Sequence, residues 1–285
     1  TRNEASRLID SIFVRSGHLI PAQGVSMENR EERITLKPDN HDMRLKYYEL
    51  ILESRGLAEL PCYPLPEGYR YVYYREGDKK DWIAIETSAR EFILPEEGES
   101  AWKRYYAGKE KNWRTELFFV ETTDGEKVAT ATAFYEPRDL SGAGWLHWVA
   151  VKREYQGKGI AKALISHTLH RLKELGYPSI KIPTQTNTWV AARLYLDFGF
   201  RPVPQNAVDS QIGYGILKTL TNHPALAGFE PVPYEEIWDS RMVQIEKRLR
   251  EQYSGLVHFR VLEENGQDRI LYCTESGAGE WDGAL

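Results

Sequence analysis

The stretch that decides the fold is VKREYQGKGIAKAL, residues 151–164, which continues directly from GWLHWVAV at residues 144–151. Residues 144–151 have the composition of a strand, and the apolar spacing from residue 159 to 175 predicts a helix. Gly157 and Gly159 permit a tight turn between the two. A strand that passes through glycines into a helix presents unpaired backbone N–H groups and the positive end of the helix dipole. The stretch is therefore typical either of a phosphate-binding loop or of an ordinary loop with glycines between a strand and a helix.

Two common phosphate loops are excluded by the letters. A P-loop needs G-x-x-x-x-G-K-[ST], but Lys152 stands five residues before Gly157, and Gly159 follows Lys158 where Ser or Thr is required. A dinucleotide fingerprint needs G-x-G-x-x-G, and Lys162 takes the place of its third glycine. The loop belongs to neither class.

The loop resembles the pyrophosphate loop of the GNAT superfamily of acyl-CoA-dependent N-acyltransferases. The pattern [QR]-x-x-G-x-[GA] is met at residues 156–161, and the preceding V-x-V stands at 149–151. Arg153 replaces the Pro that the family commonly carries there. A second family element, A-x-x-L-Y-x-x-x-G-F, occupies residues 191–200. The two elements stand in the family order, and the resemblance covers about residues 68–220.

The resemblance implies an α/β fold with a mixed, mostly antiparallel central sheet flanked by helices, in which two neighbouring strands splay apart to form a cofactor cleft. It implies acetyl-CoA as cosubstrate, whose acetyl group moves directly to an amine in a ternary complex. Backbone groups of the strand would pair with the pantetheine arm, and amides of the loop would hold the pyrophosphate. The cofactor residues implied are Val149, Val151, Gln156, Gly157, Lys158, Gly159, Ile160 and Ala161. Asn187 is added as a pantetheine contact near the cofactor edge.

Direct transfer requires a neutral amine and benefits from a proton for the leaving thiolate. Tyr195 falls on the family position that supplies this proton; the alternative is a Tyr that packs in the core. His147 stands four residues before Val151, where arylalkylamine-type members carry a histidine of proposed basic function. An imidazole with a pKa near 6.5 suits that task, and the alternative is a packed strand histidine. Glu86 is a weaker candidate for the base.

Strand alternation places Trp145, His147, Val149 and Val151 on one side. Neither Cys62 nor Cys273 has the context of a nucleophile, which agrees with transfer without a covalent enzyme intermediate.

No metal site is expected. His167 and His170 have the spacing of a helical ligand pair, but no third ligand stands nearby, and they are interpreted as a solvated helix face. The two cysteines are too few for a thiolate zinc site or a disulfide framework.

The chain is divided into an N-terminal helical extension (1–60), an acetyltransferase domain (61–221), and a C-terminal helix with a β-hairpin (222–285). The helical spacing of apolar residues predicts a helix over residues 42–56, and YGILKTL at 214–220 predicts a last strand. The C-terminal part predicts a helix over 235–253, a hairpin over 256–274 with Asn265-Gly266 at its turn, and a loose tail. It could lid the site, extend the sheet or form a homodimer contact.

The composition of the chain excludes some classes of binding partner. The net charge of −5, from 42 acids and 37 bases, argues against a nucleic-acid binder. No apolar run is long enough to span a membrane, and no signal peptide is recognised, so a cytoplasmic protein is expected. Aromatic residues reach 12%; they could wall a hydrophobic or cationic pocket, or they could simply pack between strands. Two other functions remain open: transfer of a different acyl group, such as succinyl or malonyl, and a non-catalytic acyl-CoA-binding regulatory module.

Overall fold

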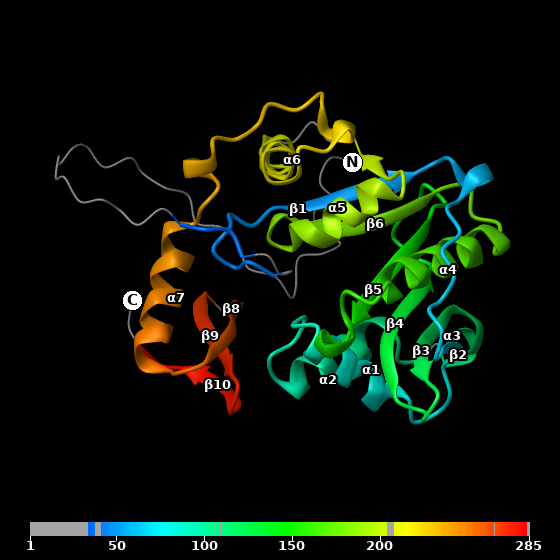
Figure 1. Cartoon of the computed structure of the whole chain (residues 1–285), viewed down its shortest axis with the longest axis horizontal. Helices are drawn as coiled ribbons and strands as arrows, with labels where there is room; N and C mark the ends of the chain where they lie inside the picture. The colour runs from blue at the N-terminus through cyan, green and yellow to red at the C-terminus, as the bar shows by residue number, and fades with distance from the viewer. Residues whose placement is uncertain (1–33, 38–40, 109, 204–207, 265, 284–285) are drawn as a thin grey trace.

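The computed structural model describes residues 34–37, 41–108, 110–203, 208–264 and 266–283 (Figure 1). The strands are β1 (Glu49–Ser54), β2 (Tyr69–Tyr73), β3 (Leu117–Thr122), β4 (Lys127–Phe134), β5 (Gly144–Val151), β6 (Ile180–Gln185), β7 (Arg201–Pro202), β8 (Leu256–Glu264), β9 (Gln267–Thr274) and β10 (Gly277–Trp281). The helices are α1 (Lys79–Ser88), α2 (Pro95–Tyr105), α3 (Glu110–Glu116), α4 (Ile160–Glu174), α5 (Trp189–Asp197), α6 (Val208–Thr221) and α7 (Ser240–Gln252).

A seven-stranded sheet in the order β2-β3-β4-β5-β6-β1-β7 forms the centre of the molecule. All its neighbouring strands are antiparallel except β5 and β6, which run parallel. These two strands pair only through Gly144–Trp145 and Ile180–Lys181, and no further pairing joins them toward their carboxyl ends. The expected mixed, mostly antiparallel sheet flanked by helices is confirmed, and the two neighbouring strands that diverge are β5 and β6.

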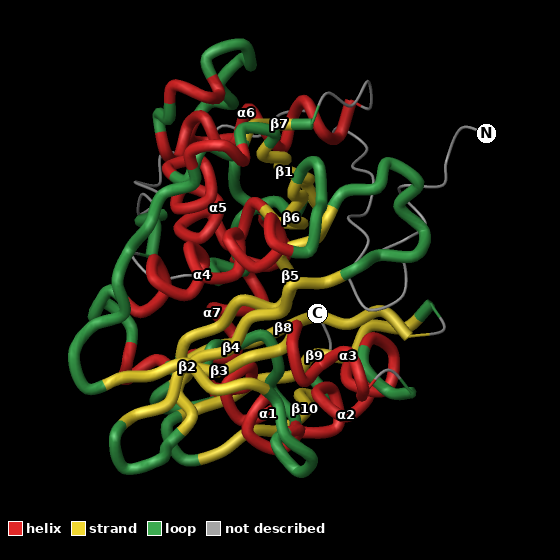
Figure 2. Tube along the Cα trace, turned by 90° about the vertical axis from the view of Figure 1, so that its right-hand side faces the viewer, coloured by secondary structure: helices red, strands yellow, loops and turns green. Residues whose placement is uncertain are grey.

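Helices cover both faces of this sheet (Figure 2). On one face α1 and α2 enclose an aromatic core around Trp82, Trp102 and Trp113. On the other face α4, α5 and α6 pack on β1, β5 and β6 around Leu146, Leu196 and other apolar side chains. The strand predicted over residues 144–151 is confirmed as β5, and the helix predicted over residues 159–175 is confirmed as α4.

The helix predicted over residues 42–56 is wrong, because β1 occupies its second half. Leu50, Leu52 and Ser54 alternate with more exposed neighbours, which is the period of a strand. The apparent helical spacing came from Leu45, which lies before the strand and forms an isolated bridge to Trp238. The helical residues proposed near the start of the chain lie outside the described residues.

The strand predicted over residues 214–220 is also wrong, since these residues belong to α6. Gly213 and Gly215 lower the helical propensity of this segment, but they allow the helix to approach its neighbours closely. A Cβ on Gly213 would come within 2.8 Å of Leu50, and one on Gly215 within 2.4 Å of the Glu230 carbonyl oxygen. Close packing against β1 therefore outweighs propensity here.

A separate three-stranded sheet, β8-β9-β10, packs against α7 at the carboxyl end of the chain (Figure 1). The predicted helix and hairpin are confirmed, with the helix beginning at Ser240 rather than at residue 235. Asp239 starts it by accepting hydrogen bonds from the N–H groups of Arg241 and Met242. The loose tail was a wrong prediction, because Gly277–Trp281 pairs with β9 as β10.

The N-terminal segment ties this C-terminal unit to the central sheet. Lys37 Nζ contacts Glu246 on α7, and Arg44 bridges Asp42 and the same glutamate, at 2.7 and 3.3 Å. Within the part of the chain that the structure describes, no helix combines the length and the apolar character needed to cross a membrane.

Candidate active site

A bulge in β5 shapes the candidate site. On β4, Thr130 and Thr132 are two residues apart, but their partners Ala150 and His147 are three apart, so β5 carries one extra residue. Trp148 takes it up with a φ of +48°, in the left-handed region that a bulky residue rarely adopts.

The bulge breaks the alternation predicted for β5. The ring of Trp148 packs against Trp82, with centroids 5.1 Å apart, on the α1 side of the sheet. Val149 packs into the cores on the α4 side. The prediction that His147 shares one side with Val149 and Val151 is therefore wrong: the ring of His147 lies with Phe134 on the α1 side.

A cavity of about 150 Å³, here called the inner cavity, opens where β5 and β6 diverge. Its walls are residues 146–149 of β5, residues 182–185 of β6, Tyr195 of α5, and the acidic side chains of Glu86 and Glu91. The structure thus brings the predicted Tyr195, His147 and Val149 to one cavity, together with the weaker candidate Glu86.

Glu86 and Tyr195 are buried in the wall of the inner cavity. Glu86 is fully buried, and among the described residues neither of its carboxylate oxygens has a hydrogen-bond partner. Burial, with a further contribution from the charge of Glu91, raises the pKa of Glu86 well above its ordinary value. Burial and the charges of the two glutamates likewise raise the pKa of Tyr195. Tyr195 is thus held as a neutral phenol, the form that can donate a proton.

His147 is half-buried and oriented by aromatic rings. Its ring stacks on Phe134 with centroids 4.5 Å apart, and it meets Tyr105 edge to face at 4.9 Å. The half-exposed position leaves the imidazole accessible from the inner cavity.

The glycine loop lies at the start of α4 and is exposed. Gly157 and Gly159 have φ values of +76° and +86°, and no Cβ added to Gly157 would meet an atom within 4 Å. The side chain of Gln156 donates a hydrogen bond to the carbonyl oxygen of Val151, at 2.9 Å, which ties the loop to β5. Ile160 then begins a helix of 15 residues. The loop therefore offers open space beside a helix N-terminus, which fits the pyrophosphate of a coenzyme A thioester.

Among the described residues, the two lysines next to the loop, Lys152 and Lys158, differ in whether an acidic side chain pairs with them. Lys152 forms an ion pair with Glu126 at 2.6 Å. Lys158 lies over the ring of Tyr155, 4.6 Å from its centroid, and its side chain is exposed.

Asn187, expected as a pantetheine contact near the cofactor edge, does not line the inner cavity. It is buried, its amide donates to the sulfur of Met43 at 3.1 Å, and it lines a second, larger cavity.

His167 stacks on Tyr71 with centroids 4.0 Å apart, and burial lowers the pKa of its imidazole. The solvated helix face predicted for it is wrong. The described residues contain no group of three or more His, Cys, Asp or Glu side chains that could hold a metal ion.

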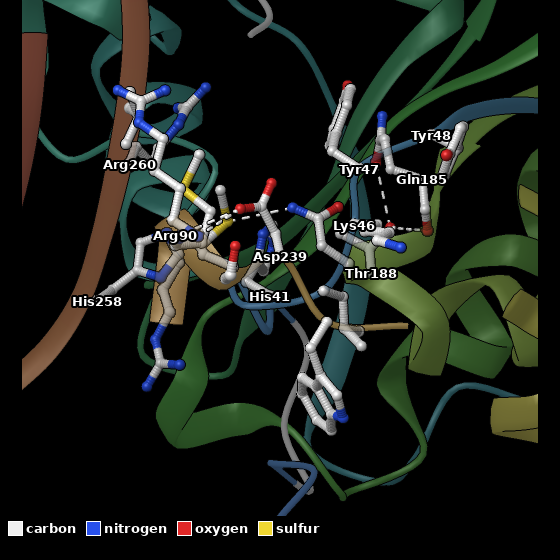
Figure 3. A pocket seen from close by; sticks show the side chains of 18 of the residues that line it. His41, Lys46, Tyr47, Tyr48, Arg90, Gln185, Thr188, Asp239, His258 and Arg260 are labelled. Atoms are coloured by element: carbon white, nitrogen blue, oxygen red, sulfur yellow. Dashed lines mark hydrogen bonds between the residues drawn. The ribbon is translucent and has the colours of Figure 1, made fainter. Parts of the chain in front are cut away.

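The second cavity, here called the outer cavity, has a volume of about 750 Å³ and adjoins the inner one through Glu91, Gln185 and Thr188. Its wall combines residues 41–48, Arg90 and Glu91 after α1, and the C-terminal unit (Figure 3). The side chains of His41, Arg90, His258 and Arg260 gather along one part of it (Figure 3). Sequence reasoning missed all four, because they come from three distant segments and follow no known spacing.

Comparison with known proteins matches part of the chain to a protein family. Residues 81–200 match the model of the acetyltransferase (GNAT) family, so the chain carries a GNAT-family domain. A mycothiol acetyltransferase of Pseudarthrobacter chlorophenolicus is 28% identical over 166 residues, which are 56% of this chain and 50% of that protein. One from Actinosynnema mirum is 28% identical over 149 residues, covering 52% and 49%. N-acetyltransferase 8B of Rattus norvegicus is 32% identical over 90 residues, covering 31% and 40%.

The chain spans about half the length of the curated mycothiol acetyltransferases that it matches. Among solved structures, a GCN5-related N-acetyltransferase from Sphaerobacter thermophilus aligns at 21% identity with a TM-score of 0.45, covering 56% of this chain and 50% of that one.

Proposed function

We propose that this protein is an N-acetyltransferase that moves the acetyl group of acetyl-CoA to an amine of a small molecule or peptide, by direct attack in a ternary complex. The observation that carries the proposal is the inner cavity, where the bulged part of β5 meets Tyr195 between two strands that splay apart. The family match over residues 81–200 supports the same reaction.

Bound acetyl-CoA supplies an acetyl group activated as a thioester. Gln156 to Ala161 hold its pyrophosphate through the amides of the loop and the start of α4. Backbone groups of Val149 and Val151 bind the pantetheine arm. The N–H groups at the bulge, next to Trp148, stabilise the negative charge that develops on the thioester oxygen when the amine attacks.

His147 takes the proton that the attacking amine must lose. It is half-buried, so a proton on its imidazole has a route to solvent, whereas Glu86 is fully buried. Tyr195 gives its proton to the thiolate that leaves when the C–S bond breaks. A C–N bond thus replaces the C–S bond. The amine loses one proton to His147, and the leaving thiolate gains one proton from Tyr195.

The alternatives are an acyltransferase that uses another acyl-CoA and a non-catalytic acyl-CoA-binding module. The test offers purified protein acetyl-CoA, succinyl-CoA or malonyl-CoA with a library of amines and measures thiol release. The proposal expects acetyl-CoA with at least one amine to release thiol well above the rate without amine. Binding of acetyl-CoA with no acceleration by any amine would support the non-catalytic module instead.

A further inference from the structure

The two cavities differ in the kind of ionisable residue that they bury. In the wall of the inner cavity the buried ionisable residues are acids: Glu86, Glu136 and Tyr195. In the wall of the outer cavity they are bases: His41, Arg90, His258 and Arg260. The carboxylates of the outer wall are half-buried or exposed, as for Glu235 and Glu236 at its rim. Burial holds Glu86 and Tyr195 neutral, whereas Arg90 and Arg260 keep their charge, so the outer cavity is the one that presents buried positive charge to a ligand.

The basic part of the outer cavity is built into the fold. Arg260 of β8 donates from Nη1 to the carbonyl oxygen of Glu91 and to Glu97 Oε1, the latter at 3.2 Å. Glu97 already accepts hydrogen bonds from the N–H groups of Ile93 and Leu94 through its other oxygen. These contacts fix the guanidinium across the gap between the C-terminal unit and the segment after α1.

Buried polar atoms in the same wall lack partners. Among the described residues, His258 Nε2 and Asn187 Oδ1 have no hydrogen-bond partner, and their residues are 4% and 5% exposed. Burial and nearby positive charges lower the pKa of His258 well below its ordinary value, so its ring is neutral near pH 7. Buried polar groups normally find a partner, and a ligand with polar groups would supply one.

Backbone strain gathers at both cavities. The described chain has four non-glycine residues with positive φ; His41 and Arg90 line the outer cavity, and Trp148 lines the inner one. Their φ values are +71°, +73° and +48°. Such conformations cost free energy and are concentrated at ligand sites in proteins.

We propose that the outer cavity binds the non-reacting part of the acceptor and that the acceptor is an amine that also carries an anionic group. The amine lies toward the acids of the inner cavity, past the junction at Glu91, and the anionic group lies against Arg90, Arg260 and His258. The outer cavity has a volume of about 750 Å³, which is typical of a site for a small molecule. This inference rests on the proposed acetyltransferase function.

The test uses pairs of amines that differ only in an anionic group, such as an amino acid and its amide, or an aminoalkylphosphonate and the matching amino alcohol. With the full chain and acetyl-CoA, kcat/KM is expected to favour the anionic member of a pair by about tenfold or more. Arg90→Asn removes the charge with a residue that tolerates positive φ and should reduce this preference to near one. Arg90→Lys, which retains the charge, should keep part of it.

The control is Arg55→Asn, which removes an exposed arginine that pairs with Glu53 and lines neither cavity. It should leave the preference unchanged, and thermal unfolding should show that each variant is folded. Calorimetric titration of the anionic amine without acetyl-CoA provides a second reading, in which Arg90→Asn weakens binding about tenfold and Arg55→Asn does not. Equal kcat/KM for both members of every pair, or equal binding to both variants, would overturn the inference. A protein that binds the anionic amine but acetylates none would instead overturn the proposed function.

Discussion

The imidazole of His147 lies nearly parallel to the ring of Phe134, with centroids 4.5 Å apart and planes inclined by 28°. Phe134 is buried at the end of β4, so the stack fixes the plane of the imidazole relative to the inner cavity. The bulge at Trp148 makes this possible, because it puts two consecutive side chains, His147 and Trp148, on the α1 side of the sheet.

The pH dependence of the rate distinguishes the two candidate bases. If His147 accepts the proton, kcat/KM rises with pH as the imidazole loses its own proton. His147→Ala should abolish this rise and lower kcat/KM by about 10²-fold at neutral pH. Glu86→Gln should preserve the rise. The opposite pattern would assign the base to Glu86.

Removal of the Tyr195 hydroxyl should affect turnover and not cosubstrate binding. Tyr195→Phe keeps the ring that packs in the α5 core and deletes only the proton donor. We expect kcat to fall by about 10²-fold, while the dissociation constant of acetyl-CoA, measured by calorimetry, changes less than twofold. A variant as active as the parent would reduce Tyr195 to a core residue.

Glu86 should make stability depend on pH. Its pKa is raised in the folded state and close to 4.5 in the unfolded chain, so unfolding releases its proton. The stability that the protonated carboxyl contributes is complete below pH 4.5 and is lost as pH rises through the raised folded pKa. Glu86→Gln cannot ionise, so its Tm should exceed that of the parent increasingly as pH rises above 4.5. Parallel Tm profiles for the two proteins would contradict the burial of an unpaired carboxyl.

A substitution at Gly159 tests whether the glycine loop binds acetyl-CoA. Its φ of +86° is unfavourable for any residue with a Cβ, so Gly159→Ala should cost about 1 kcal/mol of stability and displace the amides of the loop. Binding of acetyl-CoA should weaken about tenfold. Gly228→Ala is the matched control, because Gly228 is exposed, has no positive φ and has open space around its Cβ position. Equal acetyl-CoA affinity in the two variants would separate the loop from the cosubstrate.

Sequence patterns predicted the elements whose signals are local. The glycine loop, the helix after it and the hairpin over residues 256–274 follow from turn residues and periodicity within the segment itself. β1 and α6 were misassigned because each is determined by the other: Gly213 costs helical propensity, yet it gives α6 room against Leu50. Tertiary packing determines the secondary structure of both elements, and it cannot be predicted from the sequence of either segment alone.

The candidate site divides in the same way. Tyr195 and the loop residues stand in family patterns, and the structure brings Tyr195 to the inner cavity as those patterns implied. The bulge was not foreseen, since β5 contains neither glycine nor proline near Trp148 to announce it. The outer cavity was missed entirely, because His41, Arg90 and Arg260 meet only after three remote segments have folded together.

The position of β1 has a consequence for how the chain folds. Glu49 pairs with Gln185, and Leu52 also pairs with Pro202, so a strand synthesised early sits between two strands synthesised late. On the ribosome this segment emerges with both of its edges unpaired and keeps them so until the chain beyond residue 202 is available. Pairings so distant along the chain are slow to form, and exposed strand edges favour association with other chains. Early capture of this segment, by a chaperone or by transient local structure, would therefore govern the yield of correctly folded protein.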